Sequence, residues 1–204
     1  MKKLYLILAL IILVGLPAGA CFYTNTHNSG AVHARDLGVR PRGKDMAVAR
    51  LKIANLQSGK SVALTSRELT AWLGSAAQRD TPFRETQLKV NPDRSVEIST
   101  LLISRKLAPY AAARGYSADA ARQLVEQLGG SETVPLYIKC RPSVTRGHLA
   151  LTIQEVQVED VGIPRFILKD KQDAIRQMLQ NELQRNNIDY LRVNNGKVVL
   201  RLIG

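Results

Sequence analysis

Apolar side chains recur along this chain with two different periods, and these periods predict both helices and strands. Leu69, Trp72 and Leu73 have the spacing of one helix face, and they follow Thr65 and Glu68, which are spaced as a capping box. Residues 83–90 and 95–103 alternate apolar and polar positions around a turn at residues 91–94, with a short strand predicted before them over residues 61–64. This alternation predicts an antiparallel hairpin with one solvent-facing side.

The second half of the chain continues with strands and helices. Strands are predicted over residues 134–141, 148–158, 190–193 and 197–203, and helices over residues 118–128 and 168–185. The apolar phase slips near Gln154 and Glu155, which predicts a β-bulge, and Asn195 with Gly196 predicts a tight hairpin turn. Residues 107–116 are interpreted as a loop. The pattern therefore predicts an α+β fold, a single domain with a strongly twisted antiparallel sheet.

The N-terminus has the order of a secretory signal. Lys2 and Lys3 precede an apolar run over residues 4–16, and Pro17 and three small residues follow. Three outcomes remain open. Cleavage after Ala20 would release the protein, lipidation of Cys21 would anchor it, and an uncut segment of about twenty residues would span the bilayer as a transmembrane helix. All three predict an extracytoplasmic location, either on the outer face of the cell membrane or secreted.

Charge divides the chain into three regions: a signal peptide or membrane anchor over 1–21, a basic linker over 22–60 and an extracytoplasmic domain over 61–204. The net charge is +12, and the linker has seven basic residues against two acidic ones. Basic residues beside a membrane attract anionic headgroups, each by about 1 kcal/mol, although a solvated linker explains them equally well. Residues 47–56 also have helical content and are a candidate start for the domain. Because an exported chain rarely meets nucleic acid, we expect none as a partner.

Chemical motifs are sparse. We find no glycine-rich phosphate loop, no paired-cysteine metal motif and no nucleophile elbow in the sequence, so we expect a non-catalytic protein without cofactor or metal. Cys140 lies on an apolar strand face and is interpreted as a small buried hydrophobe. A disulfide between Cys21 and Cys140 stays open. The densest acidic group, Glu155 with Glu159 and Asp160, is interpreted as a solvated loop.

The order of short motifs resembles a known family. Residues 62–70 run from a strand into a capped helix, Val134-Pro135-Leu136-Tyr137 begins a strand, Gly162-Ile163-Pro164 precedes the last long helix, and Asn195-Gly196-Lys197 turns the final hairpin. This order resembles the YpmS-like family of membrane-anchored extracytoplasmic proteins of Gram-positive bacteria. In outline it is also similar to tubular lipid-binding domains.

The resemblance implies a curved antiparallel sheet packed around the long C-terminal helix, and it raises lipid binding as a hypothesis. An incompletely closed interface would leave an apolar groove for an amphiphilic lipid of the cell envelope. The candidate groove residues are Trp72, Leu168, Ile175, Met178, Leu179 and Leu183. The same residues also fit a dry core, which is the preferred interpretation of Trp72. The alternative function is an envelope adaptor or scaffold that binds a protein or polymer partner without a ligand.

Overall fold

The structure, a computed structural model, describes residues 32–113, 115–127, 131–159, 161–164, 173, 176–177 and 179–202. Within these ranges the chain forms an α+β fold with an open, antiparallel sheet of eight strands. The strands are β1 (Val62–Thr65), β2 (Phe83–Val90), β3 (Val96–Ile103), β4 (Thr133–Thr145), β5 (His148–Val158), β6 (Val161–Gly162), β7 (Ile188–Asn194) and β8 (Lys197–Leu202). The helices are α2 (Gly43–Gln57), α3 (Ser66–Asp80), α4 (Leu107–Ala112) and α5 (Ala118–Gln127), with a short 3-10 helix η2 (Ser104–Lys106).

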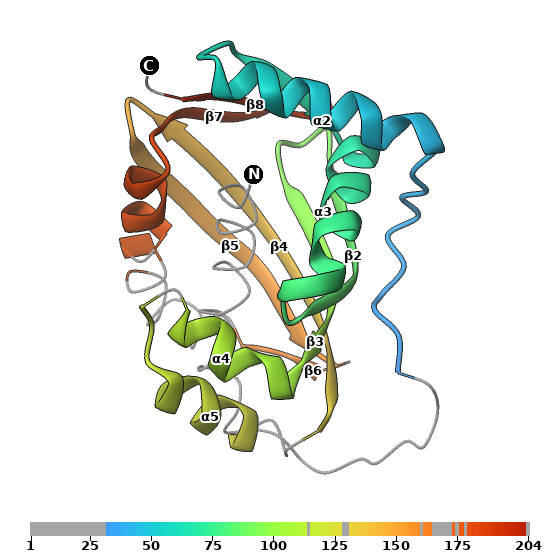
Figure 1. Cartoon of the computed structure of the whole chain (residues 1–204), viewed down its shortest axis with the longest axis vertical. Helices are drawn as coiled ribbons and strands as arrows, with labels where there is room; N and C mark the ends of the chain where they lie inside the picture. Colours follow the sequence, from blue (N-terminus) through green and yellow to red (C-terminus); the bar gives the residue numbers. More distant parts are fainter. Residues whose placement is uncertain are drawn as a thin grey trace.

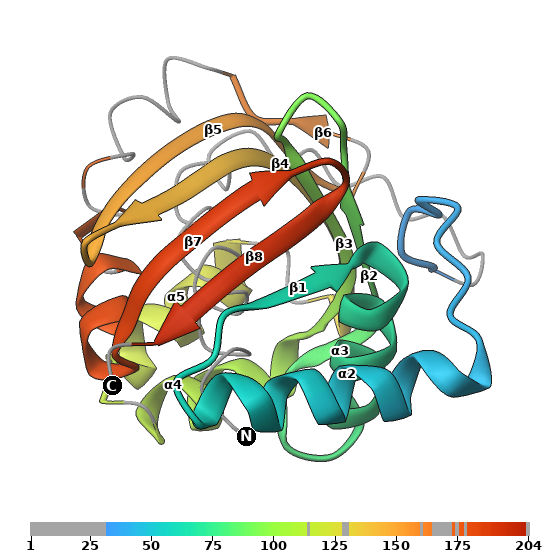
Figure 2. The ribbon, with the colours of Figure 1, turned by 90° about the horizontal axis from the view of Figure 1, so that it is seen from above.

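The long strand β4 joins the two halves of the sheet. Along one edge it pairs with β5, and along the other it pairs first with β3 and then, at Val144 and Thr145, with β7. The order β1–β8–β7 continues from there on one side, and β3–β2 on the other. β1 and β8, strands from the beginning and the end of the described chain, lie side by side (Figure 2).

The helices lie around this sheet. Figure 1 shows α2 beside β8 at one end of the molecule, α3 along β2, and α4 and α5 together at the opposite end. In the view from above, the sheet is a curved layer with α2, α3 and α4 on one side (Figure 2). The described helices make their main contacts with one another and with β1, β2 and β8, strands toward the two ends of the sheet order.

Several elements form for the local reasons that the sequence indicates. The Thr65 hydroxyl accepts a hydrogen bond from the Glu68 N–H at 3.3 Å, and the Glu68 carboxylate accepts one from the Thr65 N–H at 2.8 Å. This confirms the capping box that begins α3. Asn195 and Gly196 have φ angles of 46° and 68°, as the predicted hairpin turn requires. The predicted bulge is confirmed too, because Gln154 lies between Ile153, paired with Cys140, and Glu155, paired with Lys139.

The interpretation of residues 107–116 as a loop is wrong, because Leu107–Ala112 forms α4. Pro109 suggested an interruption. It stands in the first turn of the helix, where the N–H that proline lacks has no intrahelical partner in any case. Leu107, Tyr110 and Ala111 are buried in the hydrophobic core, so the packing of one face stabilises this short helix.

The structure also differs from the expected linker over residues 22–60. Helix α2 occupies Gly43–Gln57, consistent with the helical content seen over residues 47–56, and its Ala49, Ile53 and Leu56 belong to the hydrophobic core. Residues 32–41, which we call the strap, form no helix or strand and lie before this helix, in contact with the sheet at Gln87 and Tyr137 (Figure 1). The basic residues of this region are therefore fixed on a packed surface.

Some of the sequence predictions concern residues that lie wholly or partly outside the described ranges. The signal or anchor over residues 1–21, including Cys21, lies outside the described residues. A search of the described helices finds none with the length and apolar character needed to cross a bilayer. Of the helix predicted over residues 168–185, residues 173, 176–177 and 179–185 are described and are helical, and Asn186 and Asn187 follow in a turn.

Candidate functional site

One face of the sheet, which we call the inner face, is apolar across its strands. Cross-strand neighbours Leu88, Ile98, Ile138 and Val156 form one continuous row from β2 to β5, each 1–2% exposed. Packed aliphatic side chains in such rows stabilise a sheet through cross-strand contact as well as burial. The row crosses four neighbouring strands and therefore extends beyond a single hairpin.

The inner face continues through the other half of the sheet. Val144 of β4 is the cross-strand neighbour of Leu191, which is followed by Leu200 of β8 and Val62 of β1. All four side chains belong to the same hydrophobic cluster as the first row. The inner face is thus one apolar surface that extends from β2 to β1.

The groove residues predicted from the sequence fall into two groups. Trp72, Leu179 and Leu183 lie in this cluster and are 4%, 1% and 1% exposed. The structure therefore brings a residue of α3 and two residues of the helical segment 179–185 together with the inner face. The other three, Leu168, Ile175 and Met178, lie outside the described residues.

Cys140 lies on the inner face between Val96 and Ile153 and is completely buried. Burial away from water raises the pKa of its thiol to about 12, because the thiolate would lose its hydration. The thiol therefore stays protonated at neutral pH and is a poor nucleophile. Cys140 acts here as a small apolar side chain in a second cross-strand row, between Val96 and Ile153.

The opposite, outer face is polar. Lys89, Glu97, Lys139 and Glu155 are cross-strand neighbours on β2 to β5, so that basic and acidic residues alternate across the strands. Such opposite-charge neighbours favour the observed register, because a one-residue slip would move these charges to the inner face.

The strap covers part of this outer face, which differs from the solvent-facing side predicted for the hairpin. Leu37 and Val39 pack on Tyr137 as a small separate cluster, and the Arg35 guanidinium lies 4.3 Å from the Tyr137 ring centroid. The Leu37 N–H donates to the Gln87 side chain at 3.0 Å. Burial and the nearby Glu97 carboxylate raise the pKa of Tyr137, so its hydroxyl stays protonated and donates to Glu97.

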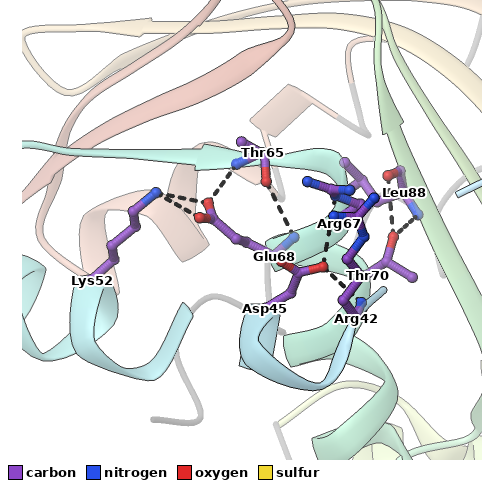
Figure 3. A network of polar contacts seen from close by, with 8 residues as sticks. All are labelled: Arg42, Asp45, Lys52, Thr65, Arg67, Glu68, Thr70 and Leu88. Carbon is purple, nitrogen blue, oxygen red and sulfur yellow. Dashed lines mark hydrogen bonds and ion pairs between the residues drawn. The ribbon is translucent and has the colours of Figure 1, made fainter. Parts of the chain in front are cut away.

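A polar network fastens α2 to α3 and to the sheet (Figure 3). The Lys52 ammonium donates to both Glu68 carboxylate oxygens and to the Ala63 carbonyl, each at 2.8 Å. The buried Asp45 carboxylate accepts from the Arg42 N–H at 2.7 Å and faces the Arg67 guanidinium at 3.7 Å. These bonds fix the rotation of α2 about its own axis, and hence which of its sides faces outward.

Thr70 links the same part of α3 to β2, and the environment of Glu68 determines its charge. The Thr70 hydroxyl accepts from the Leu88 N–H and donates to the Leu88 carbonyl, which ties α3 to β2. Desolvation opposes ionisation of Glu68, but the bonds from Lys52 and Thr65 outweigh it and lower the pKa of Glu68. The Glu68 carboxylate is therefore charged at neutral pH, as its pairing with Lys52 requires.

A surface hollow of about 480 Å³ lies beside this network. It is lined by Gly38, Val39, Arg40, Pro41, Arg42, Ser66 and Arg67. Arg40 pairs with Asp36 and Arg67 lies near Asp45, so two of its three guanidinium groups already have acidic neighbours. The hollow gives this corner of the molecule a basic surface.

Sequence reasoning also missed the buried carboxylate of Glu182. Glu182 is 1% exposed and accepts hydrogen bonds from the Tyr116 hydroxyl and the Arg185 guanidinium. The spacing of Glu182 and Arg185 on one helix was a visible signal, but the contact with Tyr116 joins residues 66 positions apart. The arrangement is a structural clamp between the C-terminal helix and the turn before α5.

Neither the metal-binding groups of the described residues nor the known proteins point to an activity. Among the described residues, His, Cys, Asp and Glu form no group of three or more that could hold a metal ion. No protein-family model, curated protein or solved structure matches this chain. The apolar inner face and the basic surface around α2 are therefore the features of the described residues that bear on function.

Proposed function

We propose that this chain is a non-catalytic, membrane-attached extracytoplasmic protein that binds an amphiphilic lipid between its curved sheet and its helices. The observation that carries the proposal is the unbroken apolar inner face. This face continues across β2, β3, β4 and β5 and is long enough to accommodate an extended ligand as well as helices. An acyl chain is long, apolar and flexible, and it matches such an extended surface.

The placement of the helices supports the same proposal. Helices α2 and α3 make their main sheet contacts with β1, β2 and β8 rather than with β4 and β5. In our proposal the predicted C-terminal helix lies along the concave side and the lipid occupies the space beside it; burial of Leu179 and Leu183 in the same cluster as the inner face supports this placement. A lipid headgroup would then remain in water at the rim of the sheet.

The location part of the proposal is supported by the sequence. The basic start, apolar run and small residues over 1–21 lead the chain across a membrane, and a carrier of amphiphilic lipid works where lipid is available. The predicted anchor, whether the apolar run itself or a lipid on Cys21, would keep the domain beside its ligand source.

Native mass spectrometry of the full chain, followed by lipid extraction, tests the proposal. The chain is purified from membranes in two detergents of different chemistry, because lipid around a membrane anchor exchanges with detergent whereas an enclosed lipid does not. We expect one lipid per chain in both detergents. A chain that carries no stoichiometric lipid in either detergent would contradict the proposal and favour the adaptor alternative.

A further inference from the structure

Helix α2 has apolar side chains on two opposite sides, and only one side is used by the fold. Ala49, Ile53 and Leu56 face the core and are at most 7% exposed. On the other side, Leu51 is 66% and Val48 is 36% exposed, and they are two of the four exposed large hydrophobic residues in the described part of the chain. Contiguous exposed apolar side chains on a helix surface are characteristic of a site that contacts a protein, a membrane or a ligand.

The helical repeat gathers these outward residues into one surface. At 100° per residue, Ala47, Leu51 and Ala54 form a central ridge, with Val48 beside it. All four are exposed. We call these four residues the outer ridge of α2. The polar network of Lys52 and Asp45 holds the helix at this rotation, so the outer ridge is a fixed feature of the surface.

The charges around the outer ridge have one sign. At 100° per residue, Arg50 lies along one side of the ridge and Lys44 lies in the first turn of α2 between the directions of Leu51 and Val48; both cations are exposed. The only acidic residue of α2 is Asp45, which is 6% exposed and bonded inward. The basic hollow at Arg40, Arg42 and Arg67 lies at the N-terminal end of the same helix. A short apolar ridge between cations fits an anionic bilayer surface, where side chains enter the headgroup boundary and cations meet lipid phosphates.

We propose that the outer ridge of α2 docks on an anionic lipid bilayer and orients the domain against the membrane. The position of α2 in the sequence agrees with this, because twenty residues or so separate it from the predicted anchor over residues 1–21. A ridge of this size binds weakly by itself, and a second attachment to the same membrane makes it effective. This docking surface does not depend on a lipid ligand inside the fold.

Tryptophan quenching by brominated lipids tests the docking of α2. The natural chain has one tryptophan, the buried Trp72, so it provides the background signal. Full-length Leu51→Trp is reconstituted in vesicles of phosphatidylglycerol and brominated phosphatidylcholine. The matched control is Val161→Trp, because Val161 is 52% exposed on β6, at the end of the molecule away from α2 (Figure 1).

We expect the added emission of Leu51→Trp to be quenched at least twofold more strongly than that of Val161→Trp. Equal quenching of the two variants would overturn the proposal. A second result would also overturn it. If the Leu51→Trp fluorophore is shielded in detergent without vesicles, and the shielding increases with protein concentration, a second copy or another protein covers the ridge.

Charge variants test the anionic character of the partner. Replacing both Lys44 and Arg50 by Gln in the Leu51→Trp chain is expected to reduce its quenching severalfold, as is vesicle composition without phosphatidylglycerol. The control replaces the exposed Arg105 of η2 and Arg122 of α5 by Gln, which removes the same charge from the end of the molecule opposite α2 and should leave quenching unchanged. Quenching that is independent of both Lys44 with Arg50 and the anionic lipid would overturn the assignment to an anionic surface.

Discussion

The inner and outer faces of the sheet both contain buried residues, but they are buried by different means. On the inner face, apolar side chains such as Ile98, Ile138 and Val156 are continuous across the strands. On the outer face, alternating charges occupy the rows, and burial of Tyr137 depends on Leu37 of the strap. The inner face is therefore the main source of stability, and we expect the outer covering, as a local attachment, to open separately.

Replacing an inner-face side chain should have the largest effect. Ile98→Ala removes three carbons from a site that is 1% exposed, and we expect it to lower the free energy of unfolding by about 2–5 kcal/mol. Urea denaturation of the full chain in detergent measures this change. Lys89→Ala, on the exposed outer side of the neighbouring strand, is the control and should change stability by less than about 0.5 kcal/mol. Similar losses for both variants would remove the distinction between the faces.

Loosening the strap should have an intermediate and more local effect. Leu37→Ala shortens the side chain that packs on Tyr137, at an expected cost of about 1–2 kcal/mol to the docked strap. Trypsin should then cleave at Arg35 or Arg42 several times faster while the urea midpoint moves little. Val32→Ala, at an exposed position of the same strap, should behave as the natural chain. A midpoint that falls as far as for Ile98→Ala would show that the strap belongs to the global fold.

The β2–β3 turn should show the smallest effect, and only in acid. Hydrogen bonds from the hydroxyl and backbone N–H of Ser95 lower the pKa of Asp93 from its usual 3.8 to about 2. The ionised form therefore stabilises the folded state above about pH 4, and this contribution is lost as the pH falls through about 2. Asp93→Asn should lower the thermal midpoint slightly at pH 6, and the two chains should converge near pH 2. A difference that stays constant across this range would show that the Asp93 charge is irrelevant.

The sequence predicts features that depend on residues close together in the chain better than features that depend on residues far apart in it. The Thr65–Glu68 cap, the Asn195–Gly196 turn and the bulge at Gln154 depend on neighbouring residues, and all three are confirmed. The strap could not be predicted in the same way, because Leu37 binds Gln87 some fifty positions away and its own pattern of residues is that of a linker.

The candidate site shows the same limit. The periodicity of Trp72 and of Leu179 with Leu183 identified apolar helix faces, and the structure places these residues with the inner face. Periodicity does not distinguish a face packed on protein from one packed on a ligand, since both require the same residue types. The outer ridge of α2 was hidden for a related reason: Leu51 and Ile53 look equivalent in sequence, and only the packed network around Lys52 determines which of them faces outward.

The most direct test of lipid binding places the same new side chain on either face of one strand. Cys140→Phe projects a ring from β4 into the inner face, and Lys139→Phe projects it from the adjacent position on the outer face. Native mass spectrometry of the full chains gives lipid occupancy, and urea denaturation gives stability. We expect Lys139→Phe to retain one lipid and Cys140→Phe to lose it with little change in stability, because the ring occupies space that the lipid leaves. A Cys140→Phe chain that loses about 1–3 kcal/mol, as overpacking of a dry core costs, and whose lipid occupancy equals that of Lys139→Phe would contradict the account.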